Sequence, residues 1–418
     1  MPMLPHNELS RMRIAIVHPW FITEGGGERV IDAIAGVCPT ADFFTLILDR
    51  STLSPNLRHR NIQASFLSSI PKGGRFYQHL MPLYHLATAT FDLSGYDLVI
   101  SSGGPATKGV IVAQGARHIH YCHSPVRFLW DQFAAWQKRL PAPLRPVFTL
   151  NAHHSREWDF NSAQRVDEFI ANSNFVAQRI RTYYRRPSTI IYPPVDTSRG
   201  YVAREREDYF ICVARLVPNK RIDLLIEACN ILRINLVIVG AGPERKSLEA
   251  AAGDTIRFLG RVDDASLSSL YAQARAFLFA AEEDFGIALV EAQSYGLPVI
   301  AYGGGGALET VIDANLHPYE APTGVLYGEQ TVESICHAIH QFLSLETQFD
   351  RLAIQDHARG FDTSIFSSKM LAAITNATQH KSPTRMPREE DEQPVHPYGF
   401  SDEESVARAP LHPTSSFR

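Results

Sequence analysis

The chain has 418 residues, of which 45% are hydrophobic, and it carries 40 Lys and Arg against 44 Asp and Glu. A chain of this length predicts two or three domains, with enough buried core to fold without disulfides. Its five cysteines form no C-x-x-C pair, which argues against structural zinc. No apolar run approaches the roughly 18 residues of a membrane span, and the first residues lack a signal-peptide core, so we expect a cytoplasmic protein.

The charge is distributed unevenly along the chain. Residues 1–200 contain 21 Lys and Arg against 14 Asp and Glu, whereas the remainder contains 19 against 30. This asymmetry suggests that the first half meets something anionic, although uneven surface charge explains it equally well. The basic and aromatic alternation of single-strand binders is missing, so we expect no nucleic acid. An anionic membrane surface or a phosphate-bearing substrate fits better.

Short β-branched runs alternate with helical segments throughout, which is typical of parallel α/β sheets. In the first half, strands are expected at 13–20, 96–102, 109–115 and 167–173, with a helix over 28–38. Residues 190–196 lead into a polar stretch over 197–209, which is interpreted as a linker.

The alternation then restarts. The second half predicts strands at 209–215, 235–242, 256–260, 274–281, 297–306 and 324–328, with helices near 223–232 and 244–252. We therefore expect an α/β fold of two sandwiches, one over residues 1–200 and one over 201–380. Residues 381–418 contain six prolines and the acidic run Glu389–Glu392, and they are predicted to be a disordered tail.

Three segments indicate a site for a phosphorylated ligand. GGGERV (25–30) follows the first strand and opens a helix, where glycines allow a phosphate to approach the backbone. ARLVPNK (214–220) places Arg215 and Lys220 just beyond a strand end, where two cations can clamp a diphosphate. By itself, each of these two segments is also compatible with an ordinary turn.

The third segment, AEEDFGIALVEAQSYGLPVIAYGGGG (281–306), is the most specific. Glu283 and Glu291 are separated by seven residues, with Phe285, Gly286 and Ile287 at an expected helix start. Free helix N–H groups bind anions or sugar oxygens, and carboxylates grip pairs of hydroxyls.

With these three segments in this order, the chain resembles the retaining glycosyltransferases of family 4, over about residues 12–375. The resemblance implies the GT-B fold, in which two Rossmann-like α/β/α domains face each other across a cleft. It also implies that the last helix, near 363–377, crosses back onto the first domain. A nucleotide sugar would bind in the cleft, mostly on the second domain.

The resemblance also implies roles for individual residues. Arg215 and Lys220 would neutralise the diphosphate, Glu283 would hold the transferred sugar, and Glu291 would bind the ribose hydroxyls. The remaining donor-binding candidates are Gly26, Gly27, Arg261, Val262, Phe285, Gly286 and Ile287.

The segment HIHYCHSPVRFLWD (118–131) matches a further family element. His123 would contact the donor sugar and is counted with Arg215, Lys220 and Glu283 as catalytic. Lys108 and Arg127 are acceptor-side candidates, and for Lys108 a plain surface position is an equal alternative.

Segments such as IYPPVD and VARLVPNKRID are similar to those of bacterial mannosyltransferases that assemble O-antigen and exopolysaccharide. That subset implies GDP-mannose as donor and a polyprenyl-diphosphate-linked oligosaccharide as acceptor, at the inner face of the cytoplasmic membrane. The resemblance implies no cofactor and no metal, and residues 1–380 contain no D-x-D element, the metal handle of another glycosyltransferase fold.

The basic and aromatic segment 72–93 suggests peripheral contact with an anionic membrane, although its apolar residues equally suit packing or an acceptor groove. Three other functions remain open: transfer from a UDP-sugar, epimerisation or hydrolysis of a nucleotide sugar, and a catalytically silent partner in glycan assembly. A dehydrogenase is disfavoured because neither half contains G-x-G-x-x-G followed by an acidic residue.

Overall fold

The structure is a computed structural model that describes residues 11–23, 25–70, 74, 76–104, 106–316 and 321–379, without the side chains of residues 78 and 79. Backbone contacts divide the chain into two units, Met1–Lys381 and Ser382–Arg418. The described residues end at 379, so the expected disordered tail over residues 381–418 lies outside them.

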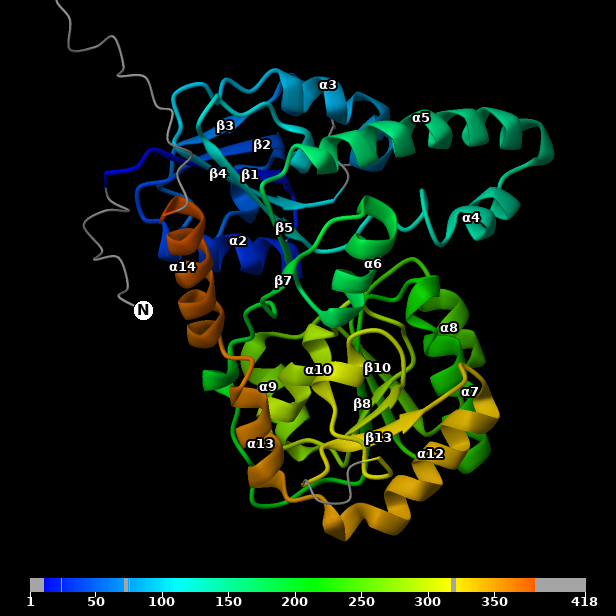
Figure 1. The fold of residues 1–418 in the computed structure, drawn as a ribbon. Coiled ribbons are helices and arrows are strands. Elements are labelled where there is room, and N and C mark those ends of the chain that lie inside the picture. The colour runs from blue at the N-terminus through cyan, green and yellow to red at the C-terminus, as the bar shows by residue number, and fades with distance from the viewer. Residues whose placement is uncertain are drawn as a thin grey trace, which may run out of the picture. The chain divides into compact units, whose positions relative to one another are not determined.

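The first half of the chain forms a parallel seven-stranded sheet with the order β3-β2-β1-β4-β5-β6-β7. Its strands are β1 (Ile14–Phe21), β2 (Asp42–Leu48), β3 (Ile62–Ala64), β4 (Leu98–Gly103), β5 (Arg117–Cys122), β6 (Glu168–Ala171) and β7 (Thr189–Ile190). Its helices are α2 (Gly26–Val37), α3 (Tyr84–Ala89), α4 (Phe133–Arg139), α5 (Arg145–Gln164) and α6 (Asn174–Tyr184). We call this part the first lobe (Figure 1).

The second half forms a parallel six-stranded sheet with the order β10-β9-β8-β11-β12-β13. Its strands are β8 (Phe210–Val213), β9 (Leu236–Val239), β10 (Ile256–Gly260), β11 (Phe277–Phe279), β12 (Val299–Tyr302) and β13 (Gly324–Tyr327). Its helices are α7 (Ile222–Leu232), α8 (Arg245–Ala251), α9 (Asp264–Gln273), α10 (Ile287–Ser294), α11 (Ala307–Thr310), α12 (Val332–Leu345) and α13 (Arg351–Arg359). We call this part the second lobe; the expectation of two α/β sandwiches is confirmed.

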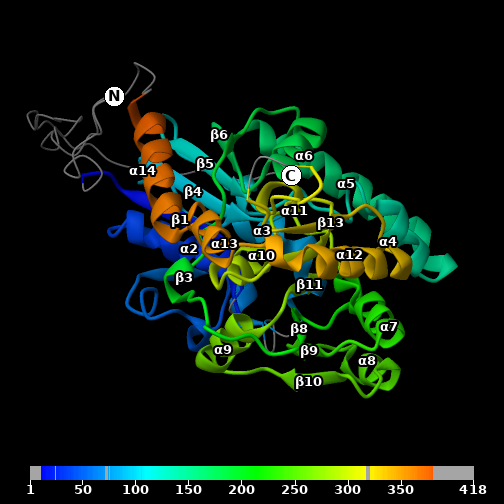
Figure 2. The same cartoon turned by 90° about the horizontal axis from the view of Figure 1, so that it is seen from below.

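The last described helix, α14 (Thr363–Gln379), follows α13 of the second lobe but packs on the first lobe. Phe366, Met370 and Ile374 are buried in the same core as residues of α2 and β1. The Phe366 ring lies 5.9 Å from that of Tyr121 in β5. Figures 1 and 2 both show α14 beside α2.

Each sheet is covered on both faces, which explains why its strands are nearly continuous apolar runs. In the first lobe, one core lies between the sheet and helices α2 and α14, and another lies on the opposite face with α3. The second lobe likewise has two cores, one including α7 and α12 and the other including α9 and α10.

The predicted strand at 109–115 is wrong. Residues 107–109 form a 3-10 turn, and the sheet position beside β4 is taken by β5, with Leu98 opposite Arg117. Val110 is buried in the core, whereas Ile111 is 63% exposed. The real strand was hidden because its buried residues include His118 and His120, whose polarity masks an apolar run.

Several further elements were not predicted, and β2 and α5 are two of them. β2 is a buried strand that follows directly on a helix and a short turn. The helix α5 buries only Ala152, Asp159, Ser162 and Ala163, so its sequence lacks the apolar periodicity that marks an amphipathic helix.

The segment 72–93 has a mixed environment. Tyr84 is buried, and Tyr77, Leu80 and Met81 pack against the core, whereas Phe76, Leu83 and Leu86 are exposed. Lys72 and Arg75 lie outside the described residues, so the proposed basic face stays a prediction. None of the helices in the described part of the chain has the length and hydrophobicity that a bilayer crossing requires.

Candidate functional site

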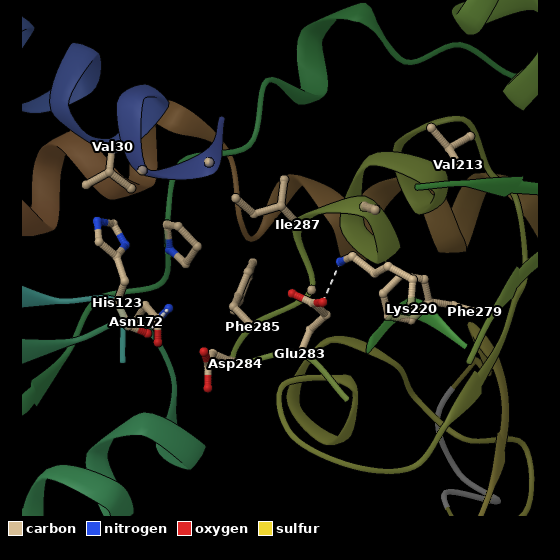
Figure 3. A pocket seen from close by; sticks show the side chains of 15 residues that line it. Val30, His123, Asn172, Val213, Lys220, Phe279, Glu283, Asp284, Phe285 and Ile287 are labelled. Carbon is tan, nitrogen blue, oxygen red and sulfur yellow. Dashed lines mark hydrogen bonds and ion pairs between the residues drawn. The ribbon is translucent and has the colours of Figure 1, made fainter. Parts of the chain in front are cut away.

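A cavity of about 340 Å³ is lined by residues from both lobes (Figure 3). The first lobe contributes Gly26, Gly27, Val30, His123, Asn172 and Pro193. The second lobe contributes Val213, Lys220, Phe279, Glu283, Asp284, Phe285, Gly286, Ile287 and Ala288.

The position of this cavity follows from the order of the strands. In each sheet the chain first adds strands on one side of the first strand and then adds strands on its other side. The strand order therefore reverses between β1 and β4 in the first lobe and between β8 and β11 in the second lobe. Open parallel sheets bind ligands outside the carboxyl ends of their strands at such a point. Gly26 follows β1, Lys220 follows β8, and Glu283 follows β11, so the fold brings three distant segments to one place.

The N-terminus of α2 borders the cavity and has the glycine Gly25 as its N-cap. A Cβ atom on Gly26 would lie 2.9 Å from Cδ1 of Ile287, so the missing side chain lets α2 approach α10. A Cβ atom on Gly27 would lie 3.6 Å from both Nε2 of His123 and Cε1 of His18. The carboxylate of Glu28 lies at this helix start, where it accepts hydrogen bonds from the backbone N–H groups of Gly25 and Glu28. An anion that binds to the N–H groups of α2 must therefore take the place of this carboxylate.

Lys220 and Glu283 form an ion pair in the cavity, drawn as a dashed line in Figure 3. Lys220 ends the 3-10 turn Pro218–Lys220, and its Nζ lies 5.6 Å from the ring centre of Phe279. Both side chains are mostly buried, so the charges are weakly screened and will act strongly on a charged ligand.

The backbone at Glu283 is held by the glycine-rich turn after β12. Glu283 and Gly305 form a β-bridge, and Gly306 N donates to Glu283 O over 2.8 Å. Gly286 caps α10 with a φ of 86°, a left-handed conformation that favours glycine. The N-terminus of α10 therefore faces the cavity in a fixed position.

His123 follows β5 and is placed by Ser102 of β4 and by Asn172, which directly follows β6. Ser102 Oγ lies 2.9 Å from His123 Nε2, and Asn172 Nδ2 donates to the His123 carbonyl over 3.0 Å. Burial lowers the pKa of His123 to about 4, so its ring is neutral at physiological pH. A neutral imidazole can exchange hydrogen bonds with a sugar hydroxyl.

Several polar contacts join the two lobes around the cavity. Arg29 of α2 pairs with Glu291 of α10, and Arg127 pairs with Glu282. Ser124 Oγ donates to Asp284 Oδ1 over 3.3 Å.

Further along the boundary, Glu309 of α11 caps the start of α6. Its carboxylate accepts from Asn174 N over 2.8 Å and from Phe175 N over 3.0 Å.

The predicted site residues divide into two groups. Gly26, Gly27, His123, Lys220, Glu283, Phe285, Gly286 and Ile287 all line the cavity, whereas Arg215, Arg261, Val262, Glu291, Arg127 and Lys108 do not. Arg215 and Arg261 are exposed, and Val262 packs partly against the core of the second lobe. Glu291 and Arg127 are engaged in the ion pairs between the lobes.

The structure contradicts both interpretations of Lys108. Its side chain is 1% exposed and pairs with the equally buried Asp159 of α5. Asp159 also accepts from Trp130 Nε1 over 2.9 Å. Lys108 is therefore neither a surface lysine nor available to an acceptor phosphate, because a buried charge needs its partner.

Sequence reasoning missed several residues at or near the cavity, of which Asn172, Asp284 and Arg29 are polar or charged. Asn172 is the first polar residue after the apolar strand β6, a position that could have pointed to it. Asp284 lies directly after Glu283, and Arg29 lies within the GGGER segment. Nothing in the sequence indicates that Arg29 pairs with Glu291.

Among the described residues, no group of three or more His, Cys, Asp or Glu side chains is arranged to hold a metal ion.

The architecture defines the class of this molecule. It is similar to HepE from Anabaena in complex with UDP, with a TM-score of 0.64 at 17% identity over 87% of this chain and 100% of that chain. Sucrose-phosphate synthase from Thermosynechococcus elongatus also gives a TM-score of 0.64, at 20% identity over 88% of this chain and 99% of that chain. The molecule has the GT-B fold.

Two family models match adjoining parts of the chain. Residues 24–199 match "Glycosyltransferase Family 4", and residues 196–359 match "Glycosyl transferases group 1". The chain belongs to the group 1/family 4 glycosyltransferases, which confirms the family recognised from the sequence.

The curated relatives differ in the sugars that their names give. The GtfA subunit of the UDP-N-acetylglucosamine–peptide N-acetylglucosaminyltransferase of Streptococcus gordonii is 28% identical over 52% of this chain and 46% of its own length. The alpha-1,3/1,6-mannosyltransferase ALG2 of Candida glabrata is 24% identical over 75% of this chain and 81% of its own.

A GDP-mannose-dependent phosphatidylinositol monomannoside mannosyltransferase of Mycolicibacterium smegmatis is 32% identical over 36% of this chain and 46% of its own. The chain thus spans about half the length of the first and third of these relatives.

Proposed function

We propose that this protein is a retaining glycosyltransferase that moves mannose from GDP-mannose to a polyprenyl-diphosphate-linked oligosaccharide in bacterial polysaccharide synthesis. The observation that carries the transferase proposal is the Lys220–Glu283 pair, which lines the same cavity as Gly26 and Gly27 at the N-terminus of α2. The relatives named as mannosyltransferases support the choice of donor.

Each charged group has a role in this proposal. Lys220, joined by Arg215 from the loop after β8, stabilises the negative charge that develops on the departing diphosphate. Glu283 holds hydroxyls of the transferred sugar, and neutral His123 contacts the same sugar from the first lobe. The N–H groups of α2 face the phosphates.

Glu291 binds the ribose hydroxyls in this proposal, and it must first exchange its partner. In the structure its carboxylate is paired with Arg29 of the first lobe. Donor binding therefore breaks or rearranges this contact between the lobes. Because fixed cations and helix N-termini stabilise the leaving group, we propose that transfer needs no divalent metal.

A donor screen by calorimetry tests the proposal. GDP-mannose, UDP-glucose, UDP-GlcNAc and GDP are titrated in EDTA and again in Mg²⁺ against the wild type, Lys220→Ala and the control Lys246→Ala, which removes an exposed lysine of α8. We expect selective binding of GDP-mannose that Lys220→Ala weakens by roughly tenfold or more, because hydrogen bonds to charged groups are strong. Lys246→Ala should bind like the wild type.

Other results would overturn specific parts of the proposal. Preference for a UDP-sugar would replace the donor, and binding that requires a metal would refute metal independence. Failure to bind any donor would favour a catalytically silent partner. Rapid consumption of donor without acceptor would favour a nucleotide-sugar hydrolase or epimerase.

A further inference from the structure

Helices α4 and α5 form a hairpin at the periphery of the first lobe. Figures 1 and 2 both show α4 and the N-terminal half of α5 lying away from the strands of the sheet. A short segment with a 3-10 turn over Ala142–Leu144 joins the two helices. The hairpin residues named in the next paragraphs do not line the cavity of the candidate site.

The N-terminal half of α5 has two different faces. One face packs on α4: the rings of Phe148 and Phe133 stack 5.5 Å apart, and Gln137 Nε2 donates to Thr149 Oγ1 over 2.7 Å. The other face carries Leu144, Val147 and Leu150, which are 52%, 58% and 60% exposed. Because they are spaced three residues apart on and just before one helix, they lie on one side.

This apolar face lies within a segment of positive charge. Residues 132–156 contain Lys138, Arg139, Arg145 and Arg156 and no Asp or Glu. Arg139 lies over the ring of Trp136, 5.6 Å from its centre, and Trp136 is itself 44% exposed.

The turn of the hairpin is held in place by its own side chains. Arg145 Nε donates to Leu140 O over 3.1 Å, and its Nη2 donates to Lys138 O over 3.3 Å. A surface that is already ordered loses little conformational entropy when it binds a partner.

We propose that the α4–α5 hairpin docks the protein on an anionic lipid bilayer, with Trp136, Leu144, Val147 and Leu150 entering the interface. Exposed aliphatic and Trp side chains gain free energy by leaving water for the acyl boundary, while flanking Lys and Arg attract anionic headgroups. A nucleic acid would complement the cations but not the aliphatic side chains. The proposal places docking on this hairpin rather than on residues 72–93, and it does not depend on the sugar donor.

Co-sedimentation with vesicles of phosphatidylglycerol and phosphatidylcholine tests the proposal. We compare the wild type with an apolar-face variant, Val147→Glu/Leu150→Glu, and a charge variant, Lys138→Glu/Arg139→Glu. The matched control is Ile231→Glu/Leu352→Glu, which places two acids on exposed apolar positions of the second lobe. We expect each hairpin variant to lose about tenfold or more of its vesicle partitioning and the control to keep it.

A second measurement locates the contact. Lipids brominated in the acyl chain should quench tryptophan fluorescence in the wild type, and Trp136→Phe should remove that quenching. Equal binding by the wild type and the apolar-face variant, or no binding to anionic vesicles, would overturn the proposal. So would a lipid-independent dimer that Val147→Glu/Leu150→Glu dissociates, because the face would then bind a second copy.

The two proposals can fail separately. Donor titrations of the hairpin variants should match the wild type, since the substituted residues do not line the cavity. Loss of vesicle binding with intact donor binding supports docking, whereas absent donor binding in every variant affects only the proposed transferase function.

Discussion

Asp284 shows how a single side chain between the lobes responds to burial. Desolvation raises the pKa of its carboxyl to about 6, although Arg127 and Arg179 act in the opposite direction. Its Oδ1 accepts a hydrogen bond from Ser124 of the first lobe. The charge on Asp284 therefore changes close to physiological pH, at the boundary of the candidate site.

We predict that Asp284→Asn becomes more stable relative to the wild type as pH rises from 4 to 7. The folded-state pKa lies above the ordinary value of 3.8, so the folded state binds the proton more tightly and wild-type stability falls across this window. A shift of this size corresponds to about 2–3 kcal/mol. Denaturant unfolding of both proteins at pH 4 and pH 7 measures the difference.

The control for this prediction is Asp254→Asn, which neutralises an exposed carboxyl. Its stability difference from the wild type should stay nearly constant across the same pH range. If the stability difference between Asp284→Asn and the wild type also stayed constant with pH, the ionisation of Asp284 would not destabilise the folded state.

At the scale of elements, the turn after β12 sets the position of the cavity wall. A Cβ atom on Gly306 would lie 2.2 Å from the Phe285 carbonyl oxygen, and one on Gly305 would lie 2.1 Å from that of Glu283. These contacts are with backbone atoms, which cannot rotate away as a side chain can. The turn thus holds segment 283–285 at a distance that only glycine permits.

We predict that Gly306→Ala weakens donor binding by about tenfold, because segment 283–285 must shift and carry Glu283 out of position. Gly328→Ala is the control, since a Cβ atom there meets nothing within 4 Å. Calorimetry measures the donor affinities, and thermal unfolding reports how much of the change is stability. Unchanged donor affinity in Gly306→Ala would contradict the role given to this turn.

At the scale of the whole molecule, α14 couples the lobes by following one and packing on the other. In the sequence, α14 directly follows α13 of the second lobe. Its residues Phe366, Met370 and Ile374 nevertheless pack in the core of the first lobe, together with α2. The first lobe therefore buries this part of its apolar surface only after the chain has passed through the second lobe.

We predict that Phe366→Ala destabilises the protein by about 3–5 kcal/mol, because it removes a fully buried ring from the core of the first lobe. The neighbouring Ile365→Ala should cost far less, since Ile365 is 41% exposed. Guanidinium unfolding followed by far-UV circular dichroism compares the two variants. Equal destabilisation would mean that α14 does not complete this core.

Much of the architecture was determined by local sequence patterns. Buried parallel strands need apolar runs, so β1, β4, β6 and most of the second sheet could be located without a structure. The segments with Gly26, Lys220 and Glu283 could be predicted as candidate site residues because they follow predicted strands. Parallel sheets bind their ligands at the carboxyl ends of the strands.

The tertiary structure alone decided which charges meet. Arg29 and Glu291 are 262 residues apart, and Lys108 and Asp159 are 51 apart, so no local pattern records either pair. The strand β5 escaped notice because buried histidines interrupt its apolar character. The hydropathy of a segment indicates which of its side chains must be buried. Whether two charged side chains form an ion pair, whether a polar side chain is buried and whether an apolar face stays exposed all depend on which other segments pack against that segment.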